Sequence, residues 1–117
     1  MRIFKIMVLL LFFISNLYST QQKKLAYIVS DINIPFWQII SKGIKDKSNE
    51  LGYEIHIYSS NNLKKSELEN LASAISLKID GLIISPINSS TASTLLEIAK
   101  MNKIPTIVAD IGSDSQD

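Results

Sequence analysis

Four short apolar segments recur at nearly regular intervals along the chain, and this spacing constrains the fold more than any other feature. The segments begin near Leu25, Tyr53, Gly81 and Thr106, and apolar residues at helical spacing lie between them. Each interval is close to the length of one strand–helix–strand unit, about thirty residues. Connections of this kind are right-handed and join parallel strands. The sequence therefore predicts an α/β fold, a three-layer open parallel sheet built from repeated strand–helix units.

The predicted strands are 25–29, 53–58, 81–84 and 106–109, and the predicted helices are 35–51, 64–78 and 91–101. The second strand alternates polar and apolar residues, which is typical of a strand near a sheet edge. The third is almost wholly apolar, as expected of a central parallel strand. On the first helix, the predicted inward stripe consists of Phe36, Ile40, Gly43, Ile44, Lys47 and Leu51. Trp37 lies off this stripe.

Polar residues follow every predicted strand at its carboxyl end. These exits are Ser30 and Asp31, 59–62, Ser85 and Asp110. Parallel strands bring such residues to one edge, where open α/β sheets bind their ligands. Loops are polar in any α/β domain because they meet water, so polarity alone leaves a binding site and plain solvation equally open. Two large rings, Phe36 and Trp37, occupy the first strand-to-helix turn and favour a site.

The residues predict a binding protein and not an enzyme, without cofactor or metal. The first exit loop lacks the glycine cluster that cradles phosphates. The chain has no Cys, which excludes disulfides and thiolate metal sites. His56 is its only His and lies within a strand, where a structural role is far more common than catalysis. A formal net charge of +1 gives no reason to expect nucleic acid as a partner.

The N-terminus has the layout of a secretory signal peptide. Two basic residues precede an unbroken apolar run at 6–14, after which polar residues return. The run is shorter than the roughly 20 residues of a membrane-spanning helix. An uncleaved anchor or a buried strand is the alternative. We expect residues 1–19 to be a signal peptide cleaved after Ser19, residues 20–117 to form the folded domain, and the product to be periplasmic.

Five segments, taken in order, resemble the amino-terminal lobe of periplasmic sugar-binding proteins of the ribose-binding type. They read LAYIVSDINIPFW, ELGYEI, SSNN, DGLIISP and IPTIVAD, and the resemblance covers 24–110. The sugar-sensing domains of lac-repressor-like regulators share this fold. The resemblance implies an exported protein that binds a sugar or sugar-like ligand and works with the membrane permease of an ABC-type importer or with a chemosensor. The alternative is the periplasmic sensing domain of a membrane signalling protein such as a sensor kinase; a cytoplasmic repressor ranks third.

The resemblance also implies which residues contact the ligand. Rings at the positions of Phe36 and Trp37 pack against sugar faces, and the carboxylate at Asp110 accepts hydrogen bonds from sugar hydroxyls. Asp31 and Asn33 belong to the same candidate ligand-binding set, in the first exit loop. Phe36 also lies on the predicted inward stripe, so a core role stays open for it. We expect Trp37 and Asp110 to lie at the same sheet edge, with Trp37 at least partly exposed.

Three features depart from the family pattern. Ile34 precedes the Pro where ribose-type members often carry Asn, and Ile111 follows the Asp where they often carry Arg. These departures leave the ligand open, with one less densely hydroxylated than ribose among the options. Members of the family have two lobes, whereas this chain is expected to be one incomplete lobe, a fragment without the second. Its fourth strand should then have an unprotected edge.

Overall fold

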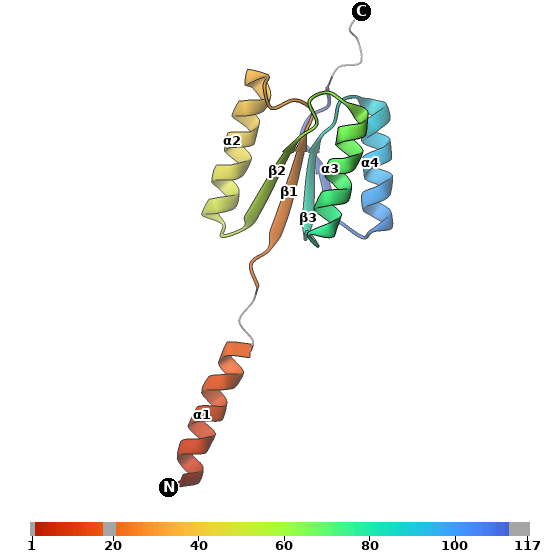
Figure 1. Cartoon of the computed structure of the whole chain (residues 1–117). Helices are drawn as coiled ribbons and strands as arrows, with labels where there is room; N and C mark the ends of the chain where they lie inside the picture. Colours follow the sequence, from red (N-terminus) through yellow and green to blue (C-terminus); the bar gives the residue numbers. More distant parts are fainter. Residues whose placement is uncertain (1, 18–20, 113–117) are drawn as a thin grey trace, which may run out of the picture.

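The computed structural model describes residues 2–17 and 21–112 and contains an N-terminal helix followed by one α/β body (Figure 1). In chain order the elements are α1 (Arg2–Leu17), β1 (Lys24–Val29), α2 (Pro35–Glu50), β2 (Glu54–Ser59), α3 (Lys64–Ser76), β3 (Gly81–Ser85), α4 (Ser89–Met101) and β4 (Thr106–Val108). The predicted boundaries of the strands and of the three helices between them agree with these within two residues.

The four strands form one parallel sheet in the order β2-β1-β3-β4. This confirms the parallel sheet, the edge position of β2 and the interior position of β3. The chain moves from β1 outward to β2 and then crosses to β3 on the other side of β1. The order therefore reverses between β1 and β3, which is the place where open α/β sheets bind ligands.

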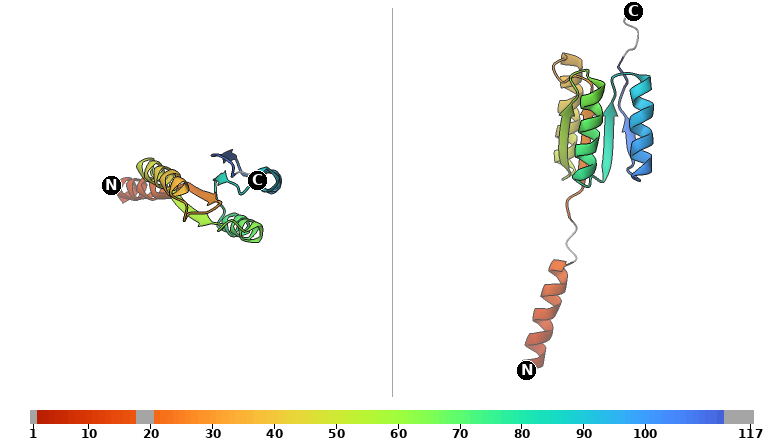
Figure 2. Two further views of the ribbon diagram at one scale, coloured as in Figure 1. Left: turned by 90° about the horizontal axis from the view of Figure 1, so that it is seen from above. Right: turned by 45° about the vertical axis from the view of Figure 1, so that its right-hand side comes forward.

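Helices cover both faces of the sheet and give it three layers (Figure 2). On one face α2 packs over a core of Tyr27, Val29 and Trp37. On the other face α3 and α4 pack over a larger core, which consists of Ala26, Ile28, Leu71, Ala74, Ile79, Leu82, Ile84, Leu95 and Ala99. Because β1 is covered on both sides, its residues from Ala26 to Val29 are wholly buried.

The inward face of α2 differs from the prediction. Its buried residues are Trp37, Ser41 and Ser48, whereas four members of the predicted stripe are exposed, namely Phe36, Gly43, Lys47 and Leu51. Ile40 and Ile44 of the predicted stripe are half-buried and pack against the core. The buried face of α2 is thus shifted from the predicted stripe toward Trp37, by less than one residue step, which is about 100° around the helix. Two small serines face the sheet and let the helix approach it. The predicted stripe, which follows three- and four-residue spacing from Phe36, does not include them.

One half of the sheet is less covered than the other. β4 pairs with β3 alone, so its outer edge carries no partner strand among the described residues. Ile107 lies on the same face as α2, but α2 packs against β1 and β2, and Ile107 remains 67% exposed. The expected unprotected edge of the fourth strand is therefore present.

The N-terminal helix α1 lies apart from these layers (Figure 1). Its large apolar side chains from Ile3 to Leu11 are exposed. Within residues 2–17 and 21–112, no helix combines the length and the apolar character that crossing a membrane requires. The predicted cleavage point after Ser19 lies outside the described residues.

Candidate functional site

The carboxyl ends of the strands bring their exit loops to one edge of the sheet, at the top of Figure 1. The exit residues divide into two groups by exposure. Three exit serines are buried and are therefore not accessible to a ligand, namely Ser30, Ser60 and Ser85. The predicted ligand residues Asn33, Phe36 and Asp110 are exposed, and Asp31 is half-buried.

The β1–α2 loop is built by local hydrogen bonds. Asp31 Oδ1 accepts from the backbone N–H of Asn33 at 3.0 Å and from its side-chain Nδ2 at 3.1 Å. The carbonyl of Asp31 accepts from Ile34 N at 3.2 Å. Pro35 then begins α2, where its missing N–H is not needed. Asp31 therefore orients the exposed amide of Asn33, in an Asx turn that a sequence of this kind favours.

The two rings, both predicted to contact the ligand, differ in exposure. Trp37 is only 7% exposed and packs with Tyr27 and Val29, so the expectation of an exposed Trp37 is wrong. Phe36 is 51% exposed and contacts Trp37 edge-to-face, with ring centroids 4.8 Å apart and planes at 71°. The shifted inward face of α2 buries Trp37 and leaves Phe36 exposed. Trp37 supports the ring of Phe36, and Phe36 is the ring that a ligand can reach.

The β2 exit is joined to the β1 exit. Ser59 Oγ accepts from Ile32 N at 3.0 Å and donates to Asn61 Oδ1 at 3.0 Å. The N–H of Asn62 donates to the carbonyl of Ser30 at 2.7 Å. Asn61 and Asn62 both have left-handed backbones, with φ of 51° and 60°, a conformation that Asn tolerates well. These contacts fix the two loops as one rigid rim.

A buried hydroxyl pair supports the other side of the edge. Tyr27 OH and Ser85 Oγ lie 2.7 Å apart, and Ser85 Oγ also donates to the carbonyl of Ala109 at 3.1 Å. Burial raises the pKa of Tyr27, which keeps its phenol neutral. The pair ties β1 and β3 to the residue before Asp110. The sequence carried one unused signal for it: a Tyr in a buried strand needs a partner for its hydroxyl.

Asp110 lies at the predicted edge in an unusual conformation. Its φ of 98° is rare for a residue with a Cβ, and such strain persists only where neighbours hold the chain. The flanking residues do so, because Ala109 N donates to the carbonyl of Ile84 and Gly112 N to that of Pro86, each at 2.8 Å. Asp110 Oδ1 accepts from Ile111 N at 2.7 Å. The placement of Asp110 at the same edge as the start of α2 is confirmed.

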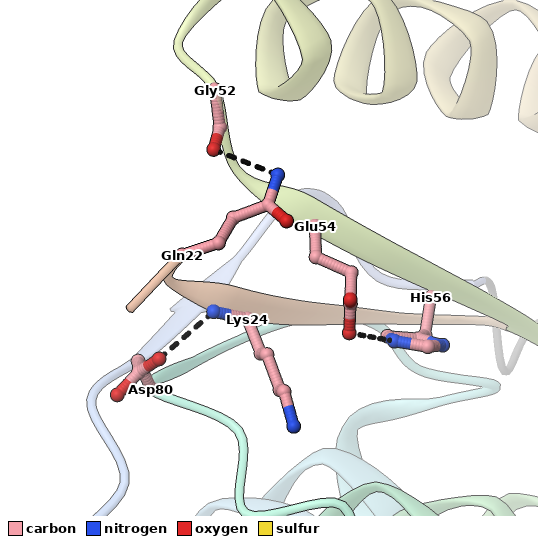
Figure 3. A network of polar contacts seen from close by, with 6 residues as sticks. All are labelled: Gln22, Lys24, Gly52, Glu54, His56 and Asp80. Carbon is pink, nitrogen blue, oxygen red and sulfur yellow. Dashed lines mark hydrogen bonds and ion pairs between the residues drawn. The ribbon is translucent and has the colours of Figure 1, made fainter. Parts of the chain in front are cut away.

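The opposite edge of the sheet is closed by its own polar contacts. Figure 3 shows this network, which joins Gln22 to Gly52, Lys24 to Asp80 and Glu54 to His56. His56 Nε2 lies 2.7 Å from Glu54 Oε2, and this bond lowers the pKa of the Glu54 carboxyl. Across the described residues, acidic and His side chains form no group of three that could hold a metal ion.

The carboxyl edge thus presents a half-exposed ring, an oriented amide and a carboxylate. A ring face suits the apolar C–H face of a polyhydroxylated molecule, and a carboxylate accepts bonds from neighbouring hydroxyls. The fold is an open parallel α/β lobe, and these side chains are exposed at its strand ends. Residues 25–117 match the family described as periplasmic binding protein domain. The chain belongs to this family.

Similar proteins agree with this assignment. The chain is 31% identical over 95 residues to the ribose import binding protein RbsB of Haemophilus influenzae, covering 81% of this chain and 32% of that protein. It is 33% identical over 70 residues to an arabinose metabolism transcriptional repressor of Halalkalibacterium halodurans, covering 60% and 19%. The crystal structure of a periplasmic ribose ABC transporter protein from Conexibacter woesei superimposes with a TM-score of 0.72 at 28% identity, covering 83% and 33%. The chain spans about a third of the length of the ribose import proteins that it matches.

Proposed function

We propose that this chain is part of an exported solute-binding protein that binds a small sugar or sugar-like ligand for an ABC-type importer or a chemosensor. Its ligand surface is the carboxyl edge, with Phe36 stacking on the ligand and Asp110 and Asn33 bonding its hydroxyls. Asp31 acts by orienting Asn33, and Trp37 by supporting Phe36. A complete site needs a second wall, which the longer relatives have room to supply.

One observation carries this proposal: exposed Asn33 and Phe36, which follow β1, lie at the same edge of the sheet as exposed Asp110, which follows β4. Two apolar side chains flank them, Ile34 at 45% and Ile111 at 40% exposure. Apolar walls beside the polar groups favour a ligand with fewer hydroxyls than a surface lined by Asn and Arg would take. Ribose, arabinose and deoxy sugars therefore form the first series to test.

Titration of the full chain with these sugars, followed by NMR amide shifts, tests the proposal. Binding should be millimolar or weaker, roughly −4 kcal/mol, because one wall leaves most of the ligand in water. A hydrogen bond facing water contributes only about 1 kcal/mol. A chain joined to a second lobe should bind far more tightly. Shifts should be confined to the carboxyl edge, and shifts centred on the Lys24–Asp80 edge would contradict the proposal.

Variants separate the ligand surface from the rest of the surface. Phe36→Ala and Asp110→Ala should weaken binding by the two-lobe chain by a few kcal/mol, since each removes a direct contact. Ile39→Ala is the matched control for the ring, because Ile39 is 72% exposed on the same helix. Asp46→Ala is the control for the carboxylate. Unchanged binding by both site variants would remove these residues from the site.

Export is the second part of the proposal and is supported by α1. Its exposed apolar side chains and basic start suit the translocation machinery better than a cytoplasmic surface. The similarity to a transcriptional repressor makes a cytoplasmic regulator the second candidate. Cell fractionation with N-terminal sequencing distinguishes the two: a periplasmic product that begins near residue 20 supports export, and a cytoplasmic product that begins at Met1 contradicts it.

A further inference from the structure

A buried carboxyl group lies beneath the carboxyl edge, behind the residues of the candidate site. Glu67 belongs to the first turn of α3 and is only 1% exposed. Its Oε2 accepts a hydrogen bond of 2.9 Å from the backbone N–H of Ile87, which lies in the loop between β3 and α4. Its Oε1 has no hydrogen-bond partner among the described residues. Burying a carboxyl group with one oxygen unpaired costs free energy, so the group is best understood by what it holds in place.

Glu67 makes a hydrogen bond and belongs to no ion pair among the described residues. Burial raises the pKa of its carboxyl group, against the opposing effects of the Ile87 N–H and the Thr91 hydroxyl. Thr91 belongs to the capping box at the start of α4, together with Asn88. The carboxyl group therefore ties α3 to the β3–α4 loop at the point where α4 begins.

The same loop holds the β4 exit. The carbonyl of Pro86 accepts the N–H of Gly112 at 2.8 Å. A Cβ placed on Gly112 would clash with the carbonyl oxygen of Ile87, so the two backbones are in direct contact. Asp110 lies two residues before Gly112, in its strained conformation. A displacement of Ile87 would therefore move the segment that presents the Asp110 carboxylate.

We propose that Glu67 is a positioning residue for the ligand edge: by fixing Ile87, and through it Gly112, it sets where Asp110 presents its carboxylate. Glu67 does not touch the ligand. The effect on binding rests on the proposed function, because it assumes that Asp110 bonds the ligand. The effect on the loop does not rest on it and can be measured without any ligand.

NMR of the ¹⁵N-labelled full chain tests the loop first. Glu67→Leu removes the acceptor and should shift the amide signals of Ile87, Ile111 and Gly112. Glu67→Gln keeps an acceptor oxygen of the same reach and should leave Ile111 and Gly112 at their wild-type positions. Glu69→Gln is the matched control, since Glu69 is exposed two residues away on the same helix.

Titration with ribose as the probe tests the binding edge. Glu67→Leu should raise the Kd for ribose roughly tenfold. Glu67→Gln should have the wild-type Kd, because it keeps the hydrogen bond to the loop. Should Glu67→Leu not fold, Gly112→Ala disturbs the same backbone contact from the other side. The shift of the Ile111 amide signal and the ribose Kd of Gly112→Ala are then measured in place of those of Glu67→Leu.

The outcomes separate this proposal from the proposed function. Unmoved Ile111 and Gly112 amides in Glu67→Leu would overturn the positioning role, whatever the chain binds. Moved amides with an unchanged ribose Kd would overturn it as well if Asp110→Ala weakens ribose binding, because the position of Asp110 would then not depend on the loop. Moved amides together with a wild-type chain that binds no sugar would support the link to the Asp110 segment and contradict the proposed function instead.

Discussion

The two loops that carry the candidate ligand residues are held in opposite ways. The β1 exit, 31–37, is held largely by its own sequence: an Asx turn, a Pro at the helix start and a Trp that enters the core. One further bond joins Ile32 N to Ser59 Oγ of the β2 exit. The β4 exit, 109–112, has no such internal support beyond one bond from Asp110 to its neighbour. The β4 exit is held instead by contacts with Ile84, Ser85 and Pro86 and with the loop that is bonded to Glu67.

This difference teaches where each half of the site is vulnerable. Changes in the β1 exit should act on the stability of the whole domain, because its anchor is part of the core. Changes around the β4 exit should act on local geometry, because its anchors are single hydrogen bonds and one close backbone contact. The predictions below test this division, beginning with the largest effect.

Trp37→Ala should destabilise the chain by about 3–5 kcal/mol, because it empties a buried site against Tyr27 and Val29. Phe36→Ala, one residue away, should cost about 1 kcal/mol or less, because half of that ring faces water. Urea unfolding followed by far-UV circular dichroism measures both losses of stability. Trp fluorescence cannot be used for both variants, because Trp37 is the only Trp. Equal losses for the two variants would contradict the buried position of Trp37 and the exposed position of Phe36.

Gly112→Ala should destabilise the chain by about 1–3 kcal/mol, because its Cβ would clash with the Ile87 carbonyl oxygen and one backbone must move. Gly43→Ala is the matched change in α2, where a Cβ meets nothing within 4 Å. It should stabilise by about 0.5–1 kcal/mol, since Ala is the better helix former. Thermal unfolding distinguishes the two variants by the sign of the change in Tm. An unchanged Tm for Gly112→Ala would show that the β4 exit can shift without loss of stability.

Asp31→Ala should cost about 1 kcal/mol, because Asn33 loses the acceptor that orients its backbone and its amide. Asp46→Ala removes a carboxylate from an exposed pair with Lys42 and should cost only about 0.3–0.5 kcal/mol. Denaturant midpoints compare the two losses. A smaller loss for Asp31 than for Asp46 would mean that the Asx turn does not hold the β1 exit.

Glu67 should give the smallest effect, seen in the pH dependence of stability. Burial raises the pKa of the Glu67 carboxyl in the folded state above the ordinary value of 4.5. The contribution of this group to the free energy of unfolding is therefore complete below pH 4.5 and is lost as pH rises through the folded-state pKa. Glu67→Gln cannot ionise, so its stability relative to wild type should increase from acid to neutral pH. Urea midpoints across this range measure the slope. Parallel curves for the two proteins would contradict a raised pKa.

The sequence was sufficient for the fold because its evidence is local and repeated. Apolar strands at regular intervals specify parallel units, and the resemblance of ordered segments pointed to the family that residues 25–117 match. The edge that carries Asp110 followed from the topology alone. Ser85 and Tyr27 were harder to identify as partners, because they come from different strands and meet only after the sheet has formed.

What the sequence by itself determined is the order of elements, the sheet edge at which their polar exits gather and the Asx turn that orients Asn33. Tertiary structure decided which face of α2 packs on the sheet, because two serines fit against the sheet and the apolar pattern did not indicate them. This arrangement buries Trp37 and exposes Phe36. Tertiary structure also decided the position of Asp110. Its backbone conformation is unfavourable in isolation and is held by Ile84, Pro86 and the loop below them, contacts that exist only once β3 and β4 lie side by side.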